Sequence, residues 1–406
     1  MTLRSLSRVC AIALAVAIAG CTTRPVPPPP PPPMVAAPQA PLAGNPLDRD
    51  MPEYLRLPGL PQGTPIRVGV ILPFSSTAPA TRALAASMMK AAQLAMFDAG
   101  NPRILLMTAD EGNGGAGAAK AAQQLLSQGA EIIVGPLFGA SVSAVAPIAR
   151  DRGVPVLAFS TEKSVAGDGV YLLSFMPQNE VRRVVTYAAS RGHRQFAGLV
   201  PQSAYGDVAQ GAFRQSVIAA GANIVDVQRF APNAAAVAGP AGIVAKSGAD
   251  AVFIPQGGAI LRAIAPTLSQ DGMARDKVKL LGTGLWDDAG LSRESALQGA
   301  WFAAPAPNAD ADFIAKYRAT FGAAPAGLAN LAYDAVSLVA LLSQGEAYHR
   351  FTAAALMDPN GFAGVNGIFR FNADGTSERG LAVLEVNAAG PAVVSPAPTT
   401  FLRPGF

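Results

Sequence analysis

The chain has 406 residues, which is enough for two ordinary domains with buried cores. Half of the residues are hydrophobic and 14% are charged, with 31 basic and 27 acidic side chains. This near balance gives no electrostatic reason to expect a nucleic-acid partner or binding to an anionic lipid surface.

The first twenty residues have the pattern of an export signal. Arg4 and Arg8 precede the apolar run Val9–Ala19, which is shorter than the ~20 residues of a membrane span. The run ends in Ile-Ala-Gly-Cys, which resembles the bacterial lipobox. We predict a lipoprotein signal peptide over residues 1–20 and a lipid anchor on Cys21; the alternative is an ordinary signal peptide with a chance cysteine. Cys10 lies in the removed run, so the exported chain keeps no thiol for a disulfide, a nucleophile or a metal site.

A proline-rich segment follows the predicted lipidation site. Seven consecutive prolines occupy residues 27–33, and a mixed Pro/Ala/Gly stretch continues to about residue 64. Such a run favours the stiff polyproline II conformation and cannot form a hydrophobic core. We therefore predict a tether over residues 21–64.

From residue 65 onward, continuous apolar runs alternate with stretches of helical periodicity. The expected strands of a first group are Ile66–Leu72, Arg103–Thr108, Glu131–Gly135 and Val154–Phe159, joined by helices at 82–99, 116–128 and 141–152. A second group has strands at 195–200, 223–230, 250–255 and 278–282, with helices at 206–220, 237–248 and 258–272. Apolar strands joined by helices predict parallel sheets covered on both faces, and hence an α/β fold with two Rossmann-like lobes.

The C-terminal part has too few elements for a third sheet. Helices are expected at 310–321, 327–342 and near 350–357, with strands at 367–371 and 381–387. These elements must return to the two lobes. The chain is therefore predicted to cross between the lobes three times, near residues 174–179, 300–305 and 362–367. The predicted lobe 1 is 65–175 plus 306–362, lobe 2 is 176–305 plus 363–390, and 391–406 is a tail.

Two short motifs suggest chemistry that their surroundings do not support. Ser160-x-x-Lys163 has the spacing of penicilloyl serine enzymes, but here the serine follows a strand and the companion S-D-N and K-T-G motifs do not occur. Gly112-Asn-Gly-Gly-Ala-Gly117 fits G-x-G-x-x-G, but it follows the second strand of its lobe instead of the first. The two histidines are far apart in the chain. We expect no catalytic residue, no cofactor and no metal site.

Five segments in sequence resemble the type I periplasmic binding proteins of the Leu/Ile/Val-binding branch. They are VGVILPFSS, IIVGPLFGASVSAVAPIARDRGVPVLAFS, VPQSAYGDVAQGAF, LANLAYDAVSLVALL and GVNGIFRFNADGTSERG. The segment GVPVLAFSTEKSVAGDGVYLLSFMPQNEVRRVV also resembles the penicillin-binding-protein activator lipoproteins. The resemblance covers roughly residues 65–390 and implies two lobes that close on a small ligand.

Ligands of open α/β sheets lie at the carboxyl ends of the strands, where helix N-termini offer free N–H groups. The residues at these ends are Ser75, Ser76, Ser160 and Thr161 in the first lobe and Tyr205, Trp286 and Asp287 in the second. The resemblance implies that Ser160 and Thr161 hold an amino-acid carboxylate, that Tyr205 closes over it and that Asp287 meets its ammonium group. Glu162 stands where the family usually has a small hydroxyl residue, and it would repel a carboxylate.

Two functions without catalysis remain. One is a lipid-anchored regulator that presents the two lobes to a peptidoglycan synthase, as an activator of a penicillin-binding protein. The other is a receptor for an ABC importer, which binds branched-chain or other amino acids and docks on a permease. Thr22 after the cysteine provides no Asp retention signal and favours the periplasmic face of an outer membrane, which in turn favours the regulator.

Overall fold

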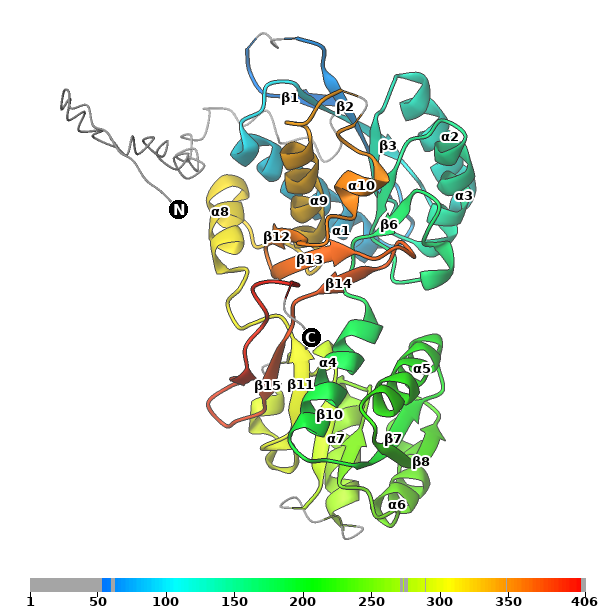
Figure 1. Ribbon diagram of the computed structural model, residues 1–406, viewed down its shortest axis with the longest axis vertical. Coiled ribbons are helices and arrows are strands. Elements are labelled where there is room, and N and C mark those ends of the chain that lie inside the picture. Colours follow the sequence, from blue (N-terminus) through cyan, green and yellow to red (C-terminus); the bar gives the residue numbers. More distant parts are fainter. Residues whose placement is uncertain are drawn as a thin grey trace, which may run out of the picture. The chain divides into compact units, whose positions relative to one another are not determined.

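The computed structural model describes residues 53–59, 63–270, 273, 277–288, 290–347 and 349–402. The predicted signal peptide, the lipidation site Cys21 and the proline run lie outside these residues. Within the described ranges, no helix is long and apolar enough to cross a membrane. Two large sheets of mostly parallel strands, each with helices on both faces, make up the two lobes (Figure 1). The predicted α/β fold is confirmed.

The first sheet has six strands in the order β1-β3-β2-β4-β5-β6. Their bounds are β1 Tyr54–Arg56, β2 Ile66–Leu72, β3 Ile104–Asp110, β4 Ile132–Val134, β5 Val156–Ala158 and β6 Val170–Leu172. β2 to β6 pair in parallel, and β1 pairs antiparallel with β3. The buried side chains of β2 alternate between the two faces, as a strand covered on both sides requires.

Helices cover each face of this sheet. The connecting helices are α1 Pro79–Ala99, α2 Gly115–Ser127 and α3 Gly139–Arg150. α2 and α3 pack on one face, and α1 packs on the other together with α9 Ala329–Leu342, which returns from the C-terminal part (Figure 1). Gly69 of β2 allows the close approach of α2, because a Cβ at this position would lie 2.9 Å from Cδ1 of Leu125.

The second sheet has seven strands in the order β16-β15-β11-β10-β9-β7-β8. Their bounds are β7 Gln195–Pro201, β8 Asn223–Phe230, β9 Ala251–Phe253, β10 Lys279–Gly282, β11 Trp301–Ala304, β15 Ala382–Glu385 and β16 Ala392–Ser395. α4 Pro177–Ser190 and α5 Ala204–Ala219 cover one face, and α6 Ala238–Ala245 and α7 Gly258–Gln270 cover the other. β7 to β11 are parallel, whereas β15 and β16 are antiparallel.

The remaining C-terminal elements belong to the first lobe. α8 Ala311–Phe321 packs against α1, where Oη of Tyr317 lies 3.0 Å from Oγ of Ser87. α10 Ala353–Leu356 follows α9. A small antiparallel sheet of β12 Phe362–Gly364, β13 Gly367–Phe371 and β14 Ser377–Arg379 completes the lobe, and its Phe369 and Phe371 are buried in the core around α1 and α9.

The third crossing of the chain differs from the prediction. It was predicted near 362–367, but β12, β13 and β14 remain with the first lobe, and the chain leaves only at Gly380–Leu381, before β15. The reason is hydrophobic, since Phe362, Phe369 and Phe371 are buried in the core of the first lobe. Residues 363–379 were therefore wrongly assigned to the second lobe.

Three other boundaries also shift. Residues 300–305 were predicted as a crossing, whereas β11 is an inner strand of the second sheet and the crossing follows it. The predicted tail begins at residue 391, yet residues 392–395 form β16. The predicted tether runs to residue 64, yet residues 54–56 form β1. The edge strands β1 and β16 were missed because neither stands between two predicted helices, as the equally short inner strand β9 does.

Candidate functional site

A cavity of about 560 Å³ lies at the carboxyl ends of the strands of the first sheet. The start of α1, the β4–α3 loop, the segments that follow β5 and β6, and the residue before α9 all contribute to its walls. The lining residues are Ala80, Thr81, Leu84, Leu137, Phe138, Gly139, Phe159, Ser160, Thr161, Glu162, Ser174, Phe175 and Leu328. The carboxyl ends of parallel strands meet at one edge of the sheet, which explains how segments far apart in the sequence form one site.

Two of the predicted ligand-binding residues line this cavity. Ser160 is 6% exposed, and its Oγ accepts a hydrogen bond from the backbone N–H of Glu162 at 3.0 Å. Thr161 is exposed at the cavity surface. Lys163, the other member of the Ser-x-x-Lys motif, forms an ion pair with Asp374 at 2.9 Å. The motif is therefore a turn after β5, and the lysine side chain is engaged away from the serine.

Glu162 lies across the start of α3. A Cβ on Gly139, the first residue of that helix, would lie 2.9 Å from Cδ of Glu162, so the carboxylate takes the space that a side chain would fill. Oγ of Ser164 donates a hydrogen bond to Oε1 of Glu162 at 2.8 Å. The cavity thus has a carboxylate on its wall, next to a helix N-terminus that favours negative charge.

The other two candidates of the first lobe lie in the turn before α1. The N–H of Ser75 donates to Oδ1 of Asp110 at 3.2 Å, and Oγ of Ser76 accepts from the N–H of Ala78 at 3.4 Å. The pKa of Asp110 is lowered overall. Burial alone would raise it, but the hydrogen bonds from Ser75 and from the N–H of Gly112 have the larger combined effect. Neither serine is among the residues that line the cavity, and a role in ligand contact stays a prediction.

The candidates of the second lobe lie apart from this cavity. Oη of Tyr205 and Oγ1 of Thr283 are 2.9 Å apart, and burial raises the pKa of Tyr205. Trp286 is 1% exposed in the core of the second lobe, with its indole N–H donating to the carbonyl of Gln256 at 2.9 Å. Burial, with a contribution from the nearby charge of Asp310, raises the pKa of Asp287. For all three, ligand contact stays a prediction.

Glu180 is a titratable residue that was not among the site residues predicted from the sequence. It lies in the first turn of α4, directly after the first crossing, and its Oε2 accepts the N–H of Gly284 at 3.0 Å. Burial raises its pKa from 4.5 to about 7. Glu180 also contributes to the raised pKa of Tyr205, so the two side chains form one electrostatic group at the start of the second lobe.

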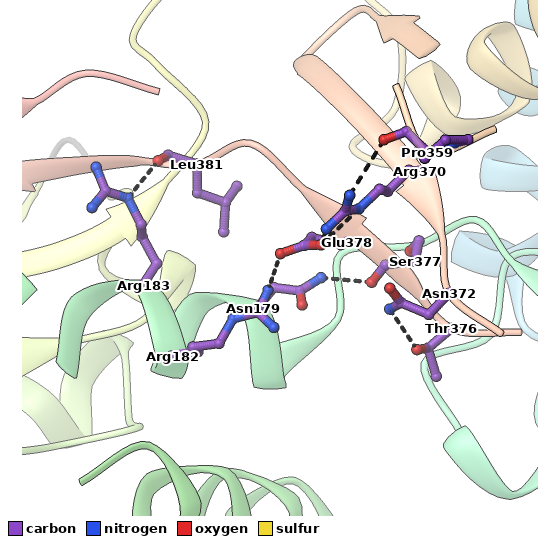
Figure 2. A network of polar contacts seen from close by, with 10 residues as sticks. All are labelled: Asn179, Arg182, Arg183, Pro359, Arg370, Asn372, Thr376, Ser377, Glu378 and Leu381. Carbon is purple, nitrogen blue, oxygen red and sulfur yellow. Dashed lines mark hydrogen bonds and ion pairs between the residues drawn. The ribbon is translucent and has the colours of Figure 1, made fainter. Parts of the chain in front are cut away.

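A polar network joins the start of α4 to the small sheet of the first lobe (Figure 2). Nδ2 of Asn179 donates to the carbonyl of Ser377 at 2.7 Å. Glu378 accepts from Arg182 at 2.5 Å and from Arg370 at 2.7 Å. These hydrogen bonds connect the two lobes at the place where the first and third chain crossings lie side by side.

Among the residues that the structure describes, no group of three or more His, Cys, Asp or Glu side chains is placed so that it could hold a metal ion.

A family model described as periplasmic binding protein matches residues 65–391. A search of the curated proteins gave no significant match.

Many solved structures share the fold. One is described as a candidate branched-chain amino acid ABC transporter from Rhodospirillum rubrum, with TM-score 0.72, 18% identity and coverage of 81% of this chain and 100% of the other. A leucine-binding protein from Thermotoga maritima has TM-score 0.56 and 19% identity, covering 82% and 98%. A solute-binding protein of an ABC transporter from Rhodopseudomonas palustris, in complex with 3,4-dihydroxybenzoic acid, has TM-score 0.56 and 19% identity, covering 82% and 96%.

Proposed function

The chain belongs to the periplasmic binding protein family, and from this premise we propose that it is a reversible receptor for a small organic solute in the periplasm. The observation that carries the proposal is the cavity of about 560 Å³ at the carboxyl edge of the first sheet. Its volume lies within the range of small-molecule sites, and it combines apolar walls with a few polar side chains. Binding is expected to favour a closed arrangement of the two lobes by its differential affinity for that state.

The partner of such a receptor is the permease of an ABC importer. Solved proteins of the same fold are described as ABC transporter components, one of them a leucine-binding protein, which supports this role. Their identity to this chain is at most 19% in these three cases, so the solute has to be argued from the cavity itself. The expected solutes are amino acids and other small organic molecules with an apolar body.

A thermal-shift screen of the chain tests this proposal. The screen uses the common amino acids, the corresponding amines that lack the carboxyl group, and simple aromatic acids. A ligand at 100 times its Kd adds about 2.7 kcal/mol to the free energy of unfolding, so a bound solute raises Tm by several degrees in a dose-dependent way. A flat response to all of these compounds would count against a solute receptor.

Phe138→Ala is the variant that localises binding to the cavity. Phe138 lines the cavity and is 46% exposed, so its truncation removes a contact surface without opening a hole in the core. We expect the solute affinity to fall roughly 10-fold, corresponding to about 1.4 kcal/mol. Ile218→Ala is the matched control, because Ile218 is 72% exposed on α5, outside the cavity lining. Equal affinities of the two variants would place the ligand elsewhere.

A second candidate function is regulation of a peptidoglycan synthase. It is supported by the resemblance of residues 153–185 to the penicillin-binding-protein activators and by the predicted lipid anchor at Cys21, which together suggest a lipoprotein of the outer membrane. The test is retention of the synthase by the immobilised chain, followed by the rate of glycan polymerisation with and without it. Absence of both effects would remove this candidate.

A further inference from the structure

The charge of the cavity points to the kind of solute that it accepts. Among its lining residues, Glu162 is the one with a charged side chain. Its carboxylate lies against Gly139 at the start of α3, and Oε1 is held by Oγ of Ser164. The chain itself therefore supplies the anion at this helix N-terminus, and a solute meets a negative group there.

The cations next to the lining residues are engaged outside the cavity. Lys163 follows Glu162 in the chain, but its Nζ pairs with Asp374 at 2.9 Å. Arg82 follows Thr81, but its Nη1 donates to the backbone carbonyl of Ser76 at 2.6 Å. Neither side chain is among the residues that line the cavity.

The charged residues that pack behind the cavity wall do not cancel the negative charge of Glu162. The Arg379 guanidinium lies 4.6 Å from the ring centroid of Phe175, but it pairs with the buried Asp334 at 3.2 Å, which compensates its charge. Glu111 is fully buried behind Leu137, whose N–H it accepts at 3.5 Å. Any ionised fraction of Glu111 adds to the negative potential of the cavity.

The rest of the wall combines four uncharged polar residues, Thr81, Ser160, Thr161 and Ser174, with a larger apolar part. The large apolar lining residues are Leu84, Leu137, Phe138, Phe159, Phe175 and Leu328, and three of these six are phenylalanines. The π-faces of aromatic rings attract cations as well as apolar groups. A solute with one positive charge and an apolar body matches both features of the wall.

We propose that the cavity binds an organic amine, with its ammonium group at the Glu162 carboxylate and its apolar or aromatic body against the phenylalanines. The inference rests on the proposed receptor function and narrows its solute class. A solute carboxylate at the same place is disfavoured, because like charges close together repel and Glu162 is already present. A charge-assisted hydrogen bond of this kind is expected to contribute roughly 10- to 100-fold in affinity.

Three probes with the same body test the charge preference: 3-phenylpropylamine, 3-phenylpropanol and 3-phenylpropanoate. Isothermal titration calorimetry of the wild-type chain at pH 7 should rank the amine first, the alcohol second and the carboxylate last, with roughly 10-fold or more between the amine and the alcohol. Because the cavity is open to solvent, the preference should decrease as salt is added.

Glu162→Gln should reduce the affinity for the amine roughly 10-fold or more and leave that for the alcohol nearly unchanged. Glu346→Gln is the matched control, since Glu346 is exposed and does not line the cavity. Thermal unfolding of the unliganded variants checks that both are folded.

The outcomes separate the inference from the function on which it rests. A wild-type chain that binds the carboxylate as tightly as the amine, or an amine preference that persists in Glu162→Gln, overturns the inference and leaves the receptor function standing. If none of the three probes and no compound of the screen binds, both fail.

Discussion

Glu180 links protonation to stability through one partly buried carboxyl group. Its pKa is raised from 4.5 to about 7 because burial disfavours the charged form, although the N–H of Gly284 partly offsets this. Between these two pH values the folded chain binds more protons at this site than the unfolded chain does. The contribution of Glu180 to the free energy of unfolding therefore decreases as the pH rises from 4.5 to 7.

Glu180→Gln should remove this pH dependence. A glutamine keeps an oxygen that can accept the N–H of Gly284, but it does not ionise. We expect the variant to gain stability relative to wild type as the pH rises from 4.5 to 8, as measured by urea denaturation at several pH values. Glu111 has a pKa raised to about 7 by burial as well, so the comparison must be between wild type and variant. An unchanged difference across this range would show that Glu180 does not titrate there.

At the residue scale, the sequence located part of the candidate site. Ser160 and Thr161 could be predicted to line it, because they directly follow an apolar strand and the carboxyl ends of parallel strands form such sites. Phe138 could not be singled out, because only the packing of α3 on the sheet decides that its ring faces the cavity. Glu180 was missed because its burial depends on Gly284, about a hundred residues away in the chain.

At the element scale, the contact between α4 and β14 connects the two lobes. Asn179 is 8% exposed and donates to the carbonyl of Ser377, which is 1% exposed. Arg182 of α4 pairs with Glu378 of β14 beside it (Figure 2). Loss of the Asn179 side chain leaves a buried carbonyl without that partner.

Asn179→Ala should therefore lower the free energy of unfolding by about 1–3 kcal/mol. Hydrogen exchange should become faster at residues 377–379, whereas the inner strands β2 and β9 should remain protected. Asn223→Ala, at an exposed position in β8, is the matched control. Exchange at 377–379 equal to that of wild type would mean that the contact does not hold β14 in place.

The prediction of elements succeeded where the apolar pattern was long. Strands that contain a continuous apolar run lie close to their predicted ranges, namely β2, β3, β7, β9 and β10, and so does β8, although polar residues interrupt its apolar ones. Helices with a clear helical period also lie close to their predicted ranges, namely α1, α2, α3, α5 and α7. The edge strands β1 and β16, and the short β6, β12 and β14, were missed because none of them stands between two predicted helices, as the equally short β9 does. The placement of β12–β14 could not be predicted, because it depends on phenylalanines that fill the core of the first lobe.

At the scale of the whole molecule, each lobe has hydrophobic cores of its own. The buried clusters of the first sheet share no residue with those of the second. The chain has two tryptophans, Trp286 and Trp301, and both are buried in the second lobe. Intrinsic tryptophan fluorescence therefore reports on one lobe, whereas far-UV circular dichroism reports on both.

We expect these two signals to follow different urea transitions, because separate cores joined by three chain crossings need not unfold together. A solute that binds in the first-lobe cavity should shift the circular dichroism transition more than the fluorescence transition. If both probes give the same transition, with and without solute, the prediction of separate unfolding is wrong. The contact between α4 and β14 would then make the two lobes unfold together.

The short strand β1 has a practical consequence for any shortened form of the protein. It forms the rim of the first sheet and pairs with β3, whose sequence ILLMTAD is largely apolar. The family match starts at residue 65, so trimming the chain to that match would remove β1 and expose the hydrogen-bonding groups of β3. Uncovered apolar strands recruit other chains into intermolecular sheets. We therefore expect a chain trimmed to residue 65 to aggregate more readily than one that keeps residues 53–59, although these residues lie outside the family match.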